Sequence, residues 1–362
     1  MARTRRWFLL SLPAACFAET NGKGRTFPSA VTRYADPATE FTVSRLTDPA
    51  HTSLLPASSG RAFSRHGNFL IYSSDLTGRF EAFRLDLKNG HARQLTEADD
   101  LNPASLTLLS DDHGFCYFDG GTLMSSSLST LRGREVYRIP EGFELGPGSS
   151  VAEDGQYAAV VEKKGSQYRL QLVRTANGAT TTLVECAEEL RDPITRPRRA
   201  SVLYRRAGAV WLANYDAQQN YRLRLAEGET GPAIWSPDGR SVLYLNYPSD
   251  KHKLHNLREF TPDTNEDKML ANTSQFVNFA CNSDASVFVG ASGSKASPHV
   301  LLLVRAVKRE LTLAEHRASD PRMVTAIFAP NSQRIFFSSD QHGKTAIYSM
   351  AVEKLVEETE AS

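Results

Sequence analysis

The sequence has few cysteines, little net charge and no long apolar run, and each absence argues against a class of protein. Its four cysteines are spread over 362 residues without close spacing, so neither a disulfide framework nor a zinc site is predicted. A formal net charge of +1 does not favour nucleic acid as a partner. Hydrophobic residues make up 41% and charged residues 23%, as in globular chains. We therefore expect a folded protein without a transmembrane helix.

The N-terminus has the layout of an export signal. In MARTRRWFLLSLPAACFA a basic stretch precedes a short apolar run that ends in small residues. This order predicts a signal over residues 1–18, and the run is too short to span a bilayer. Residues 4–9 resemble the twin-arginine export motif, with ordinary secretion as the alternative. A lipid anchor at Cys16 is less favoured, because Pro13 stands where an aliphatic residue is expected. We expect a periplasmic or extracellular protein.

A repeat of about 40 to 50 residues runs through the chain. Clear copies are FSRHGNFLIYSSD, WSPDGRSVLYLNY and FAPNSQRIFFSSD. We place the anchors of seven copies at Ser64, Ser110, Ala152, Arg196, Ser236, Asn282 and Ala329. Each copy predicts antiparallel strands joined by a tight turn, in which Asp-Gly, His-Gly or Asn-Ser supplies a residue that tolerates a left-handed or bridge conformation.

The repeat predicts the architecture. A unit of this length cannot bury both of its faces alone, so we expect an all-β, seven-bladed β-propeller of four-stranded antiparallel blades over residues 41–351. The segment FTVSRLT, residues 41–47, has the pattern of an outer strand, and we expect it to complete the last blade and close the ring. We expect residues 19–40 to form a linker and residues 352–362 a solvated acidic tail.

Several segments resemble those of oligogalacturonate lyases, seven-bladed propellers that cleave short pectin fragments by β-elimination. They are VSRLTDPAHTSLLPA, GRAFSRHGNFLIYSSD, FRLDLKNGHARQLTEA, AEGETGPAIWSPDGRSVLYLNY and SSDQHGKTAIY. The resemblance implies manganese held by histidines and a glutamine at the channel mouth, an arginine on the substrate carboxylate, and a histidine base. Such a cation and arginine neutralise the uronate, which makes the proton that the base removes more acidic.

The functional positions that the resemblance implies carry other residues in this chain. The base falls on Pro232 and the substrate arginine on Ala209. The metal ligands fall on Asn278, Asp320, Met323 and Thr325. Three explanations are open. The scaffold has lost the lyase activity; or Asp192, Asp320 and Asn278 supply oxygen ligands for a harder cation; or the alignment is displaced. Both manganese and the absence of any metal therefore stay open.

Two further sets of candidates come from the residues themselves. His51 precedes the first inner strand and is a candidate catalytic residue if its loop hangs over the channel. Arg191, Arg196 and Arg198 cluster at the start of the fourth copy, where guanidinium groups would suit an acidic sugar. A solvated loop is the alternative for these arginines.

The sequence thus predicts a propeller that binds pectin-derived oligogalacturonides or, if active, cleaves them as a polysaccharide lyase. The alternative is a non-catalytic propeller of the TolB type that binds a protein or a cell-envelope component. A basic, concave channel mouth would favour the acidic sugar, whereas an apolar mouth would favour a protein partner.

Overall fold

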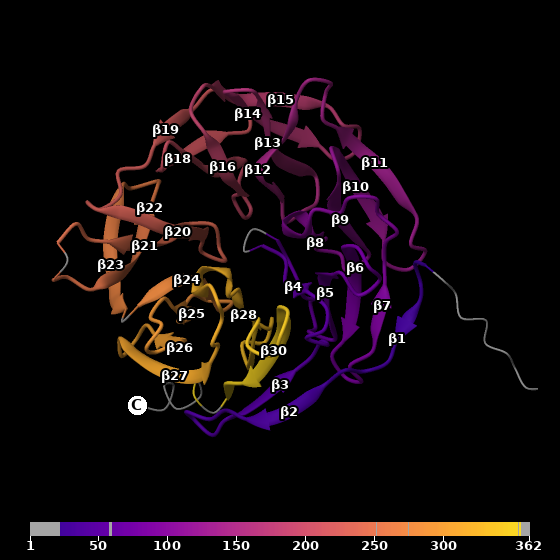
Figure 1. The fold of residues 1–362 in the computed structure, drawn as a ribbon. Coiled ribbons are helices and arrows are strands. Elements are labelled where there is room, and N and C mark those ends of the chain that lie inside the picture. Colours follow the sequence, from indigo (N-terminus) through magenta and orange to yellow (C-terminus); the bar gives the residue numbers. More distant parts are fainter. Residues whose placement is uncertain (1–21, 58–59, 251, 274, 354, 356–362) are drawn as a thin grey trace, which may run out of the picture.

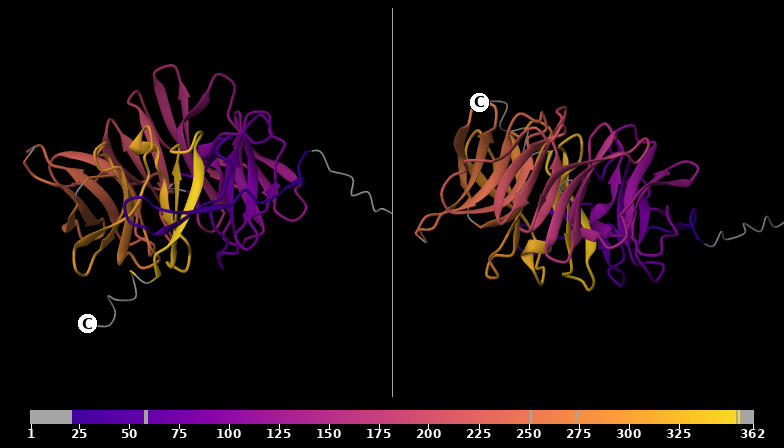
Figure 2. Two further views of the ribbon diagram at one scale, coloured as in Figure 1. Left: turned by 60° about the horizontal axis from the view of Figure 1, so that its bottom comes forward. Right: turned by 90° about the horizontal axis from the view of Figure 1, so that it is seen from above.

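The fold is a closed ring of seven antiparallel β-sheets around a central channel, as Figure 1 shows for this computed structural model. The structure describes residues 22–57, 60–250, 252–273, 275–353 and 355. The expected signal, residues 1–18 with Cys16, lies outside them. Within those ranges no helix is long and apolar enough to cross a membrane. Seen edge-on, the ring is a disc with loops on both faces (Figure 2). The expected all-β, seven-bladed propeller is confirmed.

The blades follow one another along the chain, and within each blade the strands run outward from the channel in chain order, apart from the N-terminal strands that complete the first and seventh blades (Figure 1). From the channel outward, the first blade consists of β4 (Ser53–Leu54), β5 (Phe69–Ser74), β6 (Glu81–Asp86), β7 (Ala92–Gln94) and β1 (Thr26–Phe27). The second consists of β8 (Thr107–Leu108), β9 (Gly114–Asp119), β10 (Thr122–Ser127) and β11 (Gly133–Arg138). The third consists of β12 (Glu144–Val151), β13 (Tyr157–Lys164), β14 (Gln167–Arg174) and β15 (Thr180–Cys186).

The remaining blades complete the ring in the same order. The fourth consists of β16 (Leu190–Thr195), β17 (Ser201–Arg206), β18 (Ala209–Asn214) and β19 (Asn220–Arg222). The fifth consists of β20 (Glu229–Trp235), β21 (Val242–Tyr247), β22 (His255–Thr261) and β23 (Glu266–Thr273). The sixth consists of β24 (Phe276–Cys281), β25 (Val287–Ser292), β26 (His299–Val304) and β27 (Arg309–Glu315). The seventh consists of β28 (Ala326–Phe328), β29 (Arg334–Ser339), β30 (Ala346–Ala351), β3 (Thr42–Arg45) and β2 (Thr32–Ala35). Short 3₁₀ turns, η1 (Pro103–Ser105) and η2 (Pro321–Met323), precede β8 and β28.

The turn after each innermost strand explains the repeated sequence pattern. In every blade this turn contains one residue with a left-handed φ between 57° and 71°. In the first, third and fifth blades that residue is a glycine, Gly67, Gly155 or Gly239, which has no Cβ to clash. The anchor carbonyl closes the turn: Ser64 accepts from the Gly67 N–H at 2.9 Å. In the second blade the closing carbonyl is that of Leu109, one residue before the expected anchor.

The N-terminal segment closes the ring, as the indigo strands beside the yellow β30 in Figure 1 show. On β3, Arg45 lies opposite Tyr348 of β30, so the expected closure by residues 41–47 is confirmed. Two further strands were not predicted: β2 pairs with β3, and β1 pairs with β7. Two blades therefore have five strands. The prediction that residues 19–40 form a linker is corrected, because β1 and β2 lie in this segment and belong to sheets. Such short edge strands are held by backbone pairing to a neighbour more than by their side-chain pattern.

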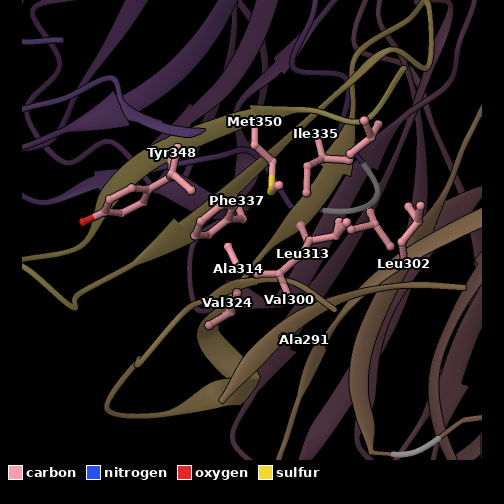
Figure 3. Packing of buried hydrophobic residues seen from close by; sticks show 14 of the residues in the cluster. Ala291, Val300, Leu302, Leu313, Ala314, Val324, Ile335, Phe337, Tyr348 and Met350 are labelled. Carbon is pink, nitrogen blue, oxygen red and sulfur yellow. The ribbon is translucent and has the colours of Figure 1, made fainter. Parts of the chain in front are cut away.

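The apolar core lies between neighbouring blades. In the cluster of Figure 3, Val300 and Leu302 of the sixth blade pack near Ile335 and Phe337 of the seventh. Val352 is only 1% exposed and belongs to this cluster, and the partly buried Leu355 packs against it, so the core extends into the expected solvated tail. Residues 356–362 of that tail lie outside the described residues.

Candidate functional site

A cavity of about 360 Å³ occupies the channel and is lined by all seven blades. Much of its wall is apolar, with Leu108, Ile194, Ile234, Trp235 and Ile327 from four different blades. The indole of Trp235 is held in place, because its Nε1 donates to the Ile194 carbonyl at 3.2 Å. The channel therefore offers a largely apolar surface.

Few of the described residues that line this cavity have polar side chains. The guanidinium of Arg61 is paired with Asp112 at 2.6 Å. Burial raises the pKa of the Cys281 thiol to about 12, so this group stays neutral at ordinary pH. Glu153 lies at the turn that ends the third innermost strand. The described residues of this wall include no set of acid–base or metal-binding groups.

The innermost strands are irregular where they begin, at the mouth that the sequence predicted. In four consecutive blades the register with the second strand shifts, within residues 145–149, 191–194, 230–233 and 276–278. These irregularities contain or adjoin Asp192, Pro232 and Asn278. Bulges of this kind re-aim side chains and are frequent beside active sites. The mouth is therefore the place where this scaffold can present chemistry.

Asp192, an expected metal ligand, is paired with arginines. Its carboxylate lies 3.7 Å from Nε of Arg191 and 3.7 Å from Nε of Arg205. Arg205 is 8% exposed and also donates to the carbonyls of Thr230 and Gly231 in the next blade. Burial lowers the pKa of Arg205, and the Asp192 carboxylate opposes that shift. Arg205 was not predicted as a functional residue, because its only signal in the sequence is an Arg-Arg pair at the end of a strand.

The other two expected ligands are also engaged. The amide of Asn278 donates to the Val324 carbonyl, and its Oδ1 accepts from the Ala291 N–H at 3.2 Å. Asp320 accepts from the Arg322 backbone N–H at 3.0 Å and from its guanidinium at 2.9 Å. These bonds hold the pKa of the Asp320 carboxyl below its usual value. Across the described ranges, no three His, Cys, Asp or Glu side chains are grouped to hold a metal ion. The expected donor set therefore does not fit manganese.

His51 lies at the seam between the seventh and first blades. Its Nδ1 is 3.7 Å from Asp75, which also accepts from Lys344 Nζ at 3.0 Å and from the Thr52 N–H at 2.6 Å. It lines a separate cavity of about 230 Å³, not the channel cavity. The expectation that His51 overhangs the channel as a catalytic residue is therefore corrected, because the loop packs into the seam instead.

The structure separates the three arginines expected to bind substrate. Arg191 lies at the mouth, with its side chain 46% exposed. Arg196 is 6% exposed; it donates to the Gly239 carbonyl at 2.6 Å and stacks on Trp235. Five residues of strand, at about 3.3 Å each, put it roughly 16 Å from Arg191. Arg198 is exposed and supplies the left-handed residue of the fourth turn, at φ 60°. Arg196 and Arg198 therefore do not share a site with Arg191.

Comparison with known proteins identifies the relatives of this chain. The family described as oligogalacturonate lyase matches residues 21–169. The oligogalacturonide lyase of Pectobacterium atrosepticum is 26% identical over 90% of this chain and 97% of that protein. The oligogalacturonate lyase of Dickeya dadantii is 25% identical with the same coverage. A solved oligogalacturonate lyase in complex with manganese is 25% identical, with a TM-score of 0.86 over 91% of this chain and 98% of that one.

The family match stops in the third blade, ahead of the positions on which the implied catalytic and metal-binding residues fall. The similarity to the two bacterial lyases and to the manganese complex, in contrast, covers nine-tenths of the chain. The chain is thus a seven-bladed propeller related to the oligogalacturonate lyases.

Proposed function

We propose that the protein binds oligogalacturonides or closely related acidic sugars at its channel mouth, without cleaving them by manganese-dependent β-elimination. The similarity to oligogalacturonate lyases along the whole ring supports this substrate class. One observation carries the non-catalytic half of the proposal, namely that the expected ligands are already engaged. The Asn278 amide binds backbone groups, and Asp192 and Asp320 are paired with arginines.

The chemistry left at the mouth suits binding better than elimination. Elimination next to a carboxylate requires a base within hydrogen-bond reach of the proton and a means of stabilising the new charge. Pro232 occupies the implied base position, and no described lining residue of the channel cavity is a histidine. Arg191 retains an exposed guanidinium at the mouth and is able to pair with a uronate carboxylate. A site of this composition holds an acidic sugar without accelerating proton removal.

The test is a paired measurement on the mature protein. Trigalacturonate is titrated calorimetrically, and the ultraviolet absorbance of an unsaturated product is followed with and without added manganese. We expect binding heat and no product in either case. Product formation would overturn the non-catalytic half, and absence of heat would overturn the binding half. Arg191→Gln should weaken binding, whereas Arg240→Gln, which changes a 79% exposed arginine on a fifth-blade turn, should not.

A second candidate is favoured by the apolar wall of the channel cavity. A non-catalytic propeller would use such a wall to hold an apolar segment of a protein partner. Ala280 lines this cavity in the sixth blade, and Ala280→Phe would narrow it. Under this reading, the substitution weakens binding of an apolar peptide and leaves oligogalacturonide binding at the mouth unchanged. Equal binding of the peptide by both forms would exclude the channel as its site.

We also propose that the chain is exported and that residues 1–18 are its signal. The charge layout and the Arg5-Arg6 pair support a twin-arginine route. Mass spectrometry of the protein in the periplasmic fraction should find the new N-terminus after Ala18. Retention of the Arg5→Lys, Arg6→Lys form in the cytoplasm would support that route, and unchanged export would favour ordinary secretion.

A further inference from the structure

The seam between the seventh and first blades holds a cavity of about 470 Å³ that shares no lining residue with the channel cavity. One wall comes from β2, β3 and β29 of the seventh blade, and the opposite wall from residues 85–90 of the first. Ser29 and Val31, in the segment that joins β1 to β2, complete the lining. In Figure 1 this region is where the indigo chain between β1 and β2 passes from the first blade to the last.

The strand register places two arginines on one face of the seventh blade. Arg33 lies opposite Ser44, Ser44 opposite Ser349, and Ser349 opposite Phe336. Opposed residues point to the same face of a sheet, and so does Arg334, two residues before Phe336 on its strand. The Arg334 guanidinium accordingly donates to the Ser349 hydroxyl at 2.8 Å and stands 5.6 Å from the Phe336 ring.

Three positively charged side chains line this cavity, and Arg334 is the partly buried one of the three. Arg33, Arg334 and Lys88 line it, and within the described part of the chain none has a carboxylate within 4.0 Å. Burial lowers the pKa of Arg334, and the charge of Arg33 lowers it further. Asp86 also lines the cavity, but its Oδ1 accepts the backbone N–H groups of Lys88 and Asn89. Arg33 and Lys88 are exposed, whereas Arg334 is partly buried. A partly buried charge is normally paired, so an anion beside Arg334 would complete this arrangement.

We propose that this cavity binds an oxyanion-bearing molecule of monosaccharide size, with its oxyanion between Arg33 and Arg334 and Lys88 at the rim. A cavity of this volume falls in the range typical of small-ligand sites and exceeds what a bare oxyanion fills. The hydroxyl of Ser44 can exchange hydrogen bonds with sugar hydroxyls, and Leu85 and Leu87 supply an apolar wall. The ligand class is therefore an acidic sugar or a sugar phosphate. This site goes beyond the proposed function, because it lies in the seam and not at the channel mouth.

The first experiment follows the thermal unfolding midpoint of the full mature protein at constant ionic strength. The ligands are galacturonate, galactose 1-phosphate, neutral galactose and inorganic phosphate. At least one of the two charged sugars should raise the midpoint more than inorganic phosphate does, and the ordering of the two distinguishes a carboxylate site from a phosphate site. Galactose should have no effect. Equal stabilisation by galactose, or by inorganic phosphate alone, would overturn the proposal.

The second experiment uses Arg33→Gln, because Arg33 is exposed on a short edge strand and its loss leaves the core intact. The affinity for the charged sugar should fall about tenfold, as expected for one charge-assisted pair. Ligand-free Arg33→Gln should also unfold at a higher temperature than the native chain in low salt, because the repulsion of Arg334 is removed. A merely structural role would lower that temperature. Arg240→Gln serves as the matched control. Arg191→Gln should leave this affinity unchanged, because Arg191 is assigned to the mouth and not to the seam cavity.

Discussion

The guanidinium of Arg205 in the fourth blade donates to the carbonyl of Thr230 in the fifth, at 3.0 Å. Asn278 of the sixth blade makes the corresponding type of contact with the Val324 carbonyl next to the seventh. Both side chains lie at the mouth, where a ligand-binding scaffold presents its polar groups. Here those groups join neighbouring blades to each other, so the shape of the mouth is held without a metal or a substrate.

Replacing Arg205 by alanine should destabilise the ring. The change leaves the Thr230 and Gly231 carbonyls without their donor, so we expect the free energy of unfolding to fall by about 3 kcal/mol. Urea unfolding followed by tryptophan fluorescence measures this loss. Arg240→Ala, at an exposed position, should cost about 0.5 kcal/mol or less. Losses of equal size would show that Arg205 is not a link between blades.

Restoring the implied metal ligands should create a manganese response. The variant carries Asn278→His, Asp320→Gln, Met323→His and Thr325→His. Because imidazoles bind transition metals well, manganese at a hundredfold excess over its Kd should stabilise the variant by about 2.7 kcal/mol and leave the native chain unchanged. Thermal unfolding with and without manganese measures the difference, with Met323→His alone as the control. Stabilisation of the native chain itself would mean that it already holds the metal through other residues.

The stability of the protein should depend on pH through His316. This residue is fully buried; its Nε2 lies 3.0 Å from the Ser292 carbonyl and its Nδ1 accepts from the Ala318 N–H. Burial lowers the pKa of His316, so the folded state favours the neutral ring. The stabilisation is therefore complete above the ordinary histidine pKa of about 6.5 and is lost as the pH falls below it. Urea unfolding between pH 7.5 and 5 should show a smaller decline for His316→Gln than for the native chain.

Two truncations should separate the roles of the N-terminal strands. A chain that begins at residue 41 loses β1 and β2 but keeps β3, so it should fold cooperatively and melt a few degrees lower. A chain that begins at residue 48 also loses β3, which leaves the edge of β30 and its apolar face uncovered. It should fail to give a cooperative transition. Circular dichroism during heating measures both, and identical behaviour of the two chains would contradict this assignment.

The sequence predicts the architecture because the repeat encodes it locally. A turn with one left-handed residue follows each innermost strand, and in the first, third and fifth blades that residue is a glycine. An apolar strand such as Val242–Tyr247 follows the turn. The short strand Thr32–Ala35 carries no such signal, because three of its four residues are exposed and it is held at the sheet edge. It was therefore expected as a linker.

The candidate site is less predictable than the fold, because the state of each polar group depends on partners distant in sequence. Arg196 reaches the Gly239 carbonyl, 43 residues further along the chain, which no local pattern near Arg196 indicates. The Asn278 amide binds a carbonyl 46 residues away. Composition identifies such residues as polar, whereas only the packing of neighbouring blades shows that their hydrogen-bonding capacity is already used.

The closure of the ring also sets the order in which the molecule can be completed. The Thr47 hydroxyl accepts from the Ile347 N–H, 300 residues later in the chain. During synthesis β3, the strand that closes the last blade, is among the first to be made. Its partner β30 is made only when nearly the whole chain has been synthesised. Contacts this distant in sequence carry a large loop-closure entropy and form slowly. The nascent protein is therefore an open arc with one uncovered blade face, and its seam cavity comes into existence only with the final strand.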